Sequence, residues 1–132
     1  MNIYLDVDGT LITKEGNPAL FLEEFLEYVT TEHNCFWLTT HCNGDTEPVI
    51  EHLKGKISGK ALGYARKIKP TTWTTLKTDG IDFTEDFRWF DDYIMEAEMA
   101  VLKERRIIYK FVHVDLKNDP EQLRKMAQSI IE

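Results

Sequence analysis

Two carboxylates lie close together near the start of the chain, directly after an apolar run. In the segment NIYLDVDGTLI, Asp6 and Asp8 are separated by one residue, and a Gly-Thr pair follows them. A charged group that is buried without a partner is costly, so acids that end a buried strand require a compensating cation. An isolated Asp-Gly pair would be explained as a turn. The interpretation therefore depends on which other residues gather beside these two acids.

Polar residues also follow two later apolar runs. The run CFWL is followed by Thr39, and the run FRWF is followed by Asp91 and Asp92. Magnesium prefers one or two carboxylates together with water and phosphate oxygens. We therefore expect a Mg²⁺ site built from Asp6, the backbone carbonyl of Asp8 and an acid from a neighbouring strand end, with a phosphorylated substrate beside it.

The elements that must position these residues alternate along the chain. Composition and alternation predict strands over residues 2–7, 35–39, 72–76, 87–90 and 107–114. Helical spacing of apolar residues predicts helices over residues 18–33, 48–53, 96–106 and 119–131. Residues 54–70 are basic and interrupted by glycine, with no clear period. This alternation predicts an α/β fold with a mainly parallel sheet, whose carboxyl edge carries the functional site.

The order of the motifs resembles that of the haloacid dehalogenase (HAD) superfamily. DVDGT after a strand, a threonine that ends the next strand, a downstream lysine and a strand that ends in DD match the four motifs of that superfamily, from Ile3 to Val114. The resemblance implies a three-layer Rossmann-like fold and a Mg²⁺-dependent phosphatase. It implies that Asp6 accepts the phosphoryl group and that Asp8 is the general acid that later activates water.

The later motifs carry further implied roles. Thr39 would hydrogen-bond the transferring phosphoryl group, with Thr40 as the alternative. Asp91 would bind the metal, and Asp92 would be a second ligand or would act through water. General chemistry agrees, because a carboxylate nucleophile divides one displacement into two easier steps. Phosphoryl transfer requires mainly alignment and charge stabilisation.

The lysine of the third motif has two candidates. Lys69 precedes Pro70 and would suit members that have a helix between the third and fourth motifs. Lys77 follows TWTTL and lies shortly before FRWFDD, as in capless members. We favour Lys77, because a site lysine is expected to leave a strand end as its partners do. It would neutralise Asp6 and the transferred phosphate.

Length and composition indicate a single-domain protein of ordinary globular composition. The chain has 132 residues, of which 42% are hydrophobic and 30% charged, so we expect one domain over residues 1–132. No apolar run is long enough to span a bilayer, and the start lacks the pattern of a signal peptide. Cys35 and Cys42 fit no zinc or redox spacing and are expected to be free thiols. The expected location is the cytoplasm.

The spacing also bears on the substrate. Larger members of the superfamily insert a cap domain after the first motif or between the second and third motifs. Here only LITKEGNP lies between the first motif and the next helix, and the segment between the second and third motifs is too short for a domain, so we expect no cap. An open site suits a bulky substrate such as a polynucleotide end or a phosphoprotein. The net charge of −7 disfavours nucleic acid, although residues 54–69 form a local basic stretch.

Other interpretations explain the acids less well. A calcium loop would need Gly and Glu where Leu11 and Asn17 stand. A receiver-like signalling domain would carry its acceptor acid on a middle strand, but no acid follows Thr39 before Asp45. A silent regulatory module remains a third hypothesis. We leave out of the catalytic set the loop residues His41 and Cys42 and the strand-end acid Asp115.

Overall fold

The centre of the molecule is a parallel sheet. The computed structural model describes residues 1–131, with side chains to Gln128. Within this part the sheet has four strands, in the order β2-β1-β3-β4, and every neighbouring pair is parallel. The strands are β1 (Asn2–Leu5), β2 (Asn34–Trp37), β3 (Phe87–Asp91) and β4 (Phe111–His113). The predicted α/β class with a parallel sheet is confirmed.

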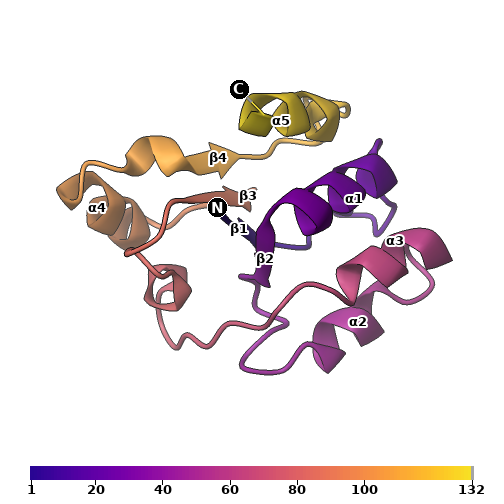
Figure 1. Ribbon diagram of the computed structural model, residues 1–132, viewed down its shortest axis with the longest axis horizontal. Coiled ribbons are helices and arrows are strands. Elements are labelled where there is room, and N and C mark those ends of the chain that lie inside the picture. The colour runs from indigo at the N-terminus through magenta and orange to yellow at the C-terminus, as the bar shows by residue number, and fades with distance from the viewer. Residues whose placement is uncertain (132) are drawn as a thin grey trace.

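Helices cover both faces of this sheet (Figure 1). They are α1 (Leu22–Glu32), α2 (Glu47–Leu53), α3 (Gly59–Ala65), α4 (Glu96–Glu104) and α5 (Gln122–Ile131), with short 3₁₀ helices η1 (Lys77–Gly80) and η2 (Ile108–Lys110). Alternate residues of a strand point to opposite faces. Ile3 and Leu5 therefore join the core formed with α1, α2, α3 and α5, whereas Tyr4 joins Trp89 and Leu102 of α4. The result is a three-layer arrangement.

The register of the sheet brings the carboxyl ends of the strands together. Leu5 of β1 pairs with Trp37 of β2 on one side and with Phe90 of β3 on the other. The backbone N–H of Asp6 then donates to the carbonyl of Phe90 at 3.0 Å. Asp6 and Asp91 consequently follow paired residues on adjacent strands, and they meet side by side at this edge.

Two predicted strands are wrong in whole or in part. Residues 72–76 form no strand, because the edge of β2 is already occupied: Trp37 N–H donates to the Lys69 carbonyl, and Lys69 N–H donates to the Cys35 carbonyl. In the stretch 107–114, only Phe111–His113 is a strand. The chain leaves α4 through Arg106, whose φ is 60°, and turns through η2 before it reaches the sheet.

The helix predictions need smaller corrections. The helix expected from Pro18 begins at Leu22, because Pro18 pairs with Ile12 in an antiparallel bridge and Phe21 has a φ of 64°. The stretch 54–70 contains α3, whose first turn is capped by Ser58. Among the helices that the structure describes, none is long and apolar enough to cross a membrane.

Candidate functional site

Three acids and a lysine meet at the carboxyl edge of the sheet. Carboxylate oxygens of Asp6, Asp91 and Asp92 lie within 4.8 Å of one another. Lys77 Nζ is 2.6 Å from Asp91 Oδ2 and 3.4 Å from Asp6 Oδ1. We call these four residues the acidic cluster. Asp6 and Asp91 are both buried, with only 7% and 1% of their surface exposed.

The charge of the acidic cluster is only partly balanced. Burial and the neighbouring charge of Asp6 raise the pKa of Asp91 to about 8. Burial also raises the pKa of Asp6, although Lys77 opposes that effect. Burial works against the charged form of Lys77, but the attraction of Asp6 and Asp91 outweighs it and raises the lysine pKa. A further positive charge would therefore stabilise the ionised acids.

A third buried acid, Glu98, holds Lys77 in position. The backbone N–H of Lys77 donates to Glu98 Oε2 at 2.6 Å, and that of Met95 donates to Glu98 Oε1 at 3.0 Å. Glu98 belongs to α4 and is 2% exposed, so it joins the start of η1 to the start of α4. The competing candidate Lys69 lies elsewhere, with its Nζ 5.8 Å from the centre of the Phe36 ring. The structure thus brings Lys77 to the acids, from a 3₁₀ helix and not from the expected strand end.

Gly9 makes room for Asp92. The φ of Gly9 is +80°, and a Cβ at this position would lie 2.5 Å from Asp92 Oδ2. A side chain there would meet both the backbone strain of the left-handed region and a direct clash. Lys14 Nζ binds the same carboxylate at 2.8 Å. Burial raises the pKa of Asp92, but the hydrogen bond from Lys14 and its other partners outweigh burial and lower it.

Asp8 belongs to a different group of side chains. His41 Nε2 is 2.7 Å from Asp8 Oδ2, and His52 Nε2 is 2.9 Å from Asp8 Oδ1. The two imidazoles stack with their centres 3.9 Å apart. We call these three residues the histidine cluster. Burial opposes ionisation of Asp8, but the hydrogen bonds from His41 and His52 outweigh it and lower the Asp8 pKa.

The threonines occupy buried positions near these groups. Thr39 is 1% exposed and follows β2, and its hydroxyl lies 3.4 Å from the backbone N of His41. Among the described residues, Thr39 makes no hydrogen bond to the acids. Thr10 is fully buried, and its hydroxyl has no partner in the described part of the chain. Thr40, the alternative to Thr39, lies in the exposed turn that follows.

The acidic cluster has the donor chemistry of a hard cation site. Its donors are carboxylate oxygens alone, and Mg²⁺ selects oxygen ligands. Burial is the main cause of the raised pKa values of Asp6 and Asp91, so a cation beside these oxygens would offset the hydration that they have lost. Asp6, Asp91 and Asp92 therefore fit the ion that the sequence motifs imply.

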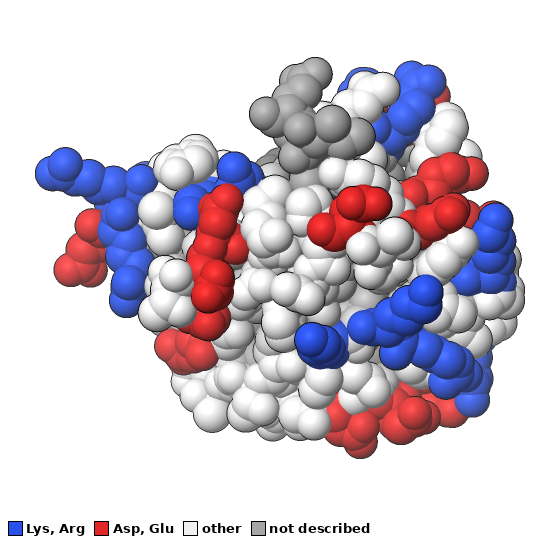
Figure 2. Space-filling view, in the orientation of Figure 1, with Lys and Arg blue, Asp and Glu red and all other residues white. Residues whose placement is uncertain are grey.

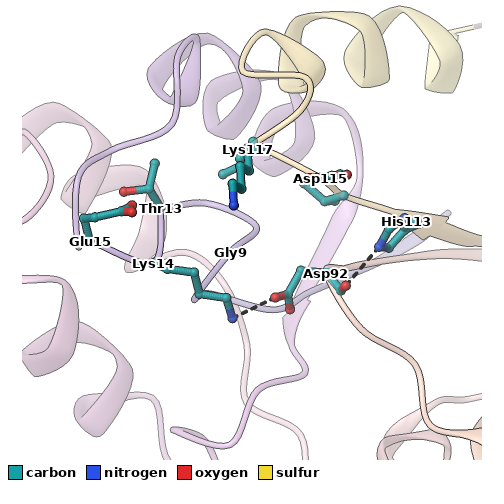
Figure 3. Close-up of a pocket in the computed structure, with 10 residues that line it drawn as sticks. Gly9, Thr13, Lys14, Glu15, Asp92, His113, Asp115 and Lys117 are labelled. Atoms are coloured by element: carbon teal, nitrogen blue, oxygen red, sulfur yellow. Dashed lines mark hydrogen bonds and ion pairs between the residues drawn. The ribbon is translucent and has the colours of Figure 1, made fainter.

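A cavity of about 520 Å³ borders the acidic cluster (Figure 3). Gly9 and Asp92 lie at its inner side, where the dashed line joins Lys14 to Asp92. Lys117 extends toward the same space from the loop after β4. On the face seen in Figure 2, a band of Lys and Arg side chains lies at the lower right, in the region of α2 and α3, and the acidic side chains form separate groups elsewhere.

Sequence reasoning missed several residues that belong to these clusters or contact them. His41 stood in the loop after Thr39 but was left out of the catalytic set, although its closeness to the second motif was a usable signal. His52, Lys14 and Glu98 carry no local signal, because only the folded chain brings them to the acids. Cys42 is buried, and its thiol points to the Thr71 carbonyl.

Comparison of the chain with protein-family models, curated proteins and solved structures returned no match.

Proposed function

We propose that this protein is a Mg²⁺-dependent phosphohydrolase of the HAD type that acts through an aspartyl-phosphate on Asp6. One observation carries the proposal: Lys77 lies between Asp6 and Asp91 at the edge where the parallel strands end, with Asp92 beside them. This arrangement combines a nucleophilic carboxylate, a fixed positive charge and a set of oxygen donors within one site.

Asp6 is the nucleophile in this proposal. Its oxygen forms a bond to phosphorus while the bond from phosphorus to the leaving oxygen breaks. Lys77 supports the ionised form of Asp6 and offsets the negative charge of the phosphoryl group. A Mg²⁺ ion held by Asp6, Asp91 and Asp92 would add positive charge against the repulsion between carboxylate and phosphate.

Asp8 moves the proton in both steps. In its protonated form Asp8 gives a proton to the leaving oxygen. The carboxylate that results then takes a proton from a water molecule, which attacks phosphorus and breaks the bond to Asp6. His41 and His52 hold both of its oxygens, which fixes the direction of the carboxylate. Their hydrogen bonds lower the Asp8 pKa and so favour the second step, in which Asp8 is the base.

The leaving group would occupy the cavity beside Gly9 and Asp92. Lys14 and Lys117 border this space, and the size of the cavity admits more than a phosphate ion. The substrate class that we propose is a phosphate ester at a bulky end, such as a phosphoprotein or a polynucleotide end.

The test is release of inorganic phosphate from an aryl phosphate, with Mg²⁺ and with EDTA. We expect Mg²⁺-dependent turnover that Asp6→Asn abolishes. Asp82→Asn is the matched control, because Asp82 is exposed and contacts Thr84. Unchanged turnover in Asp6→Asn would refute the proposal. A stable phosphoprotein without turnover would instead indicate a receiver-like acceptor domain.

A further inference from the structure

The histidine cluster differs in its chemistry from the acidic cluster. His41 and His52 each present Nε2, and Asp8 presents both carboxylate oxygens. Two imidazole nitrogens and a carboxylate oxygen form a donor set that suits Zn²⁺ and related transition ions, whereas Mg²⁺ prefers oxygen alone. The acidic cluster contains no nitrogen donor other than the positively charged Lys77. The two clusters should therefore select different metals.

The donors of the histidine cluster already converge. One donor atom from each of its three residues lies within 4.8 Å of the others. Ligand distances of about 2.0–2.2 Å in a tetrahedral zinc site place neighbouring donor atoms roughly 3.3 Å apart. The two contacts to Asp8 are shorter than that spacing and reach different oxygens, at 2.7 Å from His41 Nε2 to Oδ2 and at 2.9 Å from His52 Nε2 to Oδ1. A bound zinc ion would therefore separate the nitrogens from the carboxylate and would use either one of its two oxygens.

Each donor also comes from a fixed part of the backbone. His52 lies in α2 next to Leu53, which is buried in the core. His41 lies between the buried residues Thr39 and Cys42, and Cys42 N–H donates to the Thr39 carbonyl at 3.1 Å. Because these neighbours hold the backbone, little ordering is needed when a metal binds. The side chains remain partly open to solvent, at 28% for His41, 25% for His52 and 41% for Asp8, so an ion can enter.

We propose that His41, His52 and Asp8 form a zinc-binding site whose occupation stops the phosphohydrolase. Zinc would be bound by Nε2 of each histidine and by one oxygen of Asp8, and the fourth position would remain for water or a phosphate oxygen. A carboxylate bound to zinc neither gives nor accepts the proton that catalysis needs. Inhibition rests on the proposed function, whereas zinc binding does not.

Lys56 provides a test in which a substitution should strengthen zinc binding and not weaken it. Its Nζ lies 3.5 Å from His52 Nδ1 and 2.6 Å from the His52 carbonyl oxygen. A histidine that binds zinc through Nε2 carries its proton on Nδ1 and donates it to an acceptor. Lys56 offers a positive charge there and no acceptor. Removing that charge should therefore strengthen zinc binding at this site, which it would not do at an unrelated surface histidine.

The experiment is a titration of the protein with ZnCl₂ in a calorimeter, without substrate, with Mg²⁺ present in excess. We expect one tight zinc ion per chain. His41→Ala and His52→Ala should each weaken it by more than about tenfold, since even residues behind the ligands matter by 10–100-fold. Lys56→Met should strengthen it. His33→Ala is the matched control, because His33 contacts Met1 and Tyr28 and not Asp8.

The zinc site would be refuted if zinc binding were unchanged in His41→Ala and in His52→Ala. It would also be refuted if His33→Ala removed the binding. The same holds if no tight ion binds, and His41 and His52 would then be positioning residues for Asp8. In an activity assay, zinc should inhibit the wild type at saturating Mg²⁺ and inhibit His52→Ala at least about tenfold more weakly. Zinc binding with no phosphatase activity in the wild type would refute the proposed function and leave the metal site standing.

Discussion

Replacement of Lys77 by methionine tests the electrostatic reasoning most directly. Methionine keeps the length and the apolar stem of the side chain but removes the positive charge between Asp6 and Asp91. Both acids are buried, so neither can regain in water what it loses from the lysine. Removing one partner of a buried ion pair leaves an uncompensated charge, and the acid then takes up a proton.

The free-energy cost of protonating Asp6 sets the size of the expected loss of stability. An aspartate in water has a pKa of about 3.9, so keeping it protonated costs about 4 kcal/mol at pH 7 and about 1.5 kcal/mol at pH 5. These values are the upper limits of the stability that the variant can lose when Asp6 takes up a proton. We therefore expect Lys77→Met to lower the free energy of unfolding by about 3 kcal/mol at pH 7 and by at most about 1.5 kcal/mol at pH 5, measured without Mg²⁺.

Urea unfolding followed by circular dichroism at the two pH values measures this difference. Lys69→Met is the matched control, because Lys69 is exposed and lies over the Phe36 ring, away from the acids. We expect the control to change stability little at either pH. The reasoning is refuted if Lys77→Met is no more destabilising than Lys69→Met at pH 7, or if its effect is the same at both pH values.

Three further outcomes are expected. Gly9→Ala should lower the melting temperature and weaken Mg²⁺ binding in calorimetry, because its Cβ would meet Asp92 Oδ2 at 2.5 Å in a left-handed backbone. Without metal, the stability of the wild type should fall as pH rises from about 4 to about 8, because the pKa of Asp91 is about 8 in the folded protein and lower in the unfolded chain. Urea unfolding in EDTA at several pH values measures this fall, and Asp91→Asn should make it smaller. Glu98→Ala should cost about 3 kcal/mol in urea unfolding, because two partly buried N–H groups, those of Lys77 and Met95, lose their acceptor, and Glu98→Gln should cost less. A flat pH profile, a glutamine variant as damaging as the alanine one, or unchanged metal binding in Gly9→Ala would each contradict its prediction.

Much of the fold was readable from local patterns. Strands were predicted over residues 2–7, 35–39 and 87–90, and in the structure their boundaries shifted by only one or two residues. The exceptions have a common cause. Residues 72–76 have the composition of a strand, but strand formation also needs a free sheet edge, and Lys69 already occupies that of β2. Composition records the preference of a residue and not the availability of a partner.

The sequence by itself determined which residues could do chemistry at the edge of the sheet. Asp6, Asp91 and Asp92 follow apolar runs in a parallel α/β pattern, and parallel strands bring their carboxyl ends to one edge. The order of these acids along the chain is enough to place them together, because the shared edge of parallel strands brings them close whatever their side-chain contacts are.

Only the tertiary structure decided which partner each acid has. Lys77 reaches Asp6 and Asp91 from a 3₁₀ helix held by Glu98, and the Asp8 carboxylate contacts His41 and His52. These contacts join segments that are tens of residues apart, through side-chain directions that local sequence does not encode. The sequence thus predicted a group of acids at one edge of the sheet. The packing of loops and helices divides them between the acidic cluster and the histidine cluster, whose chemistry differs.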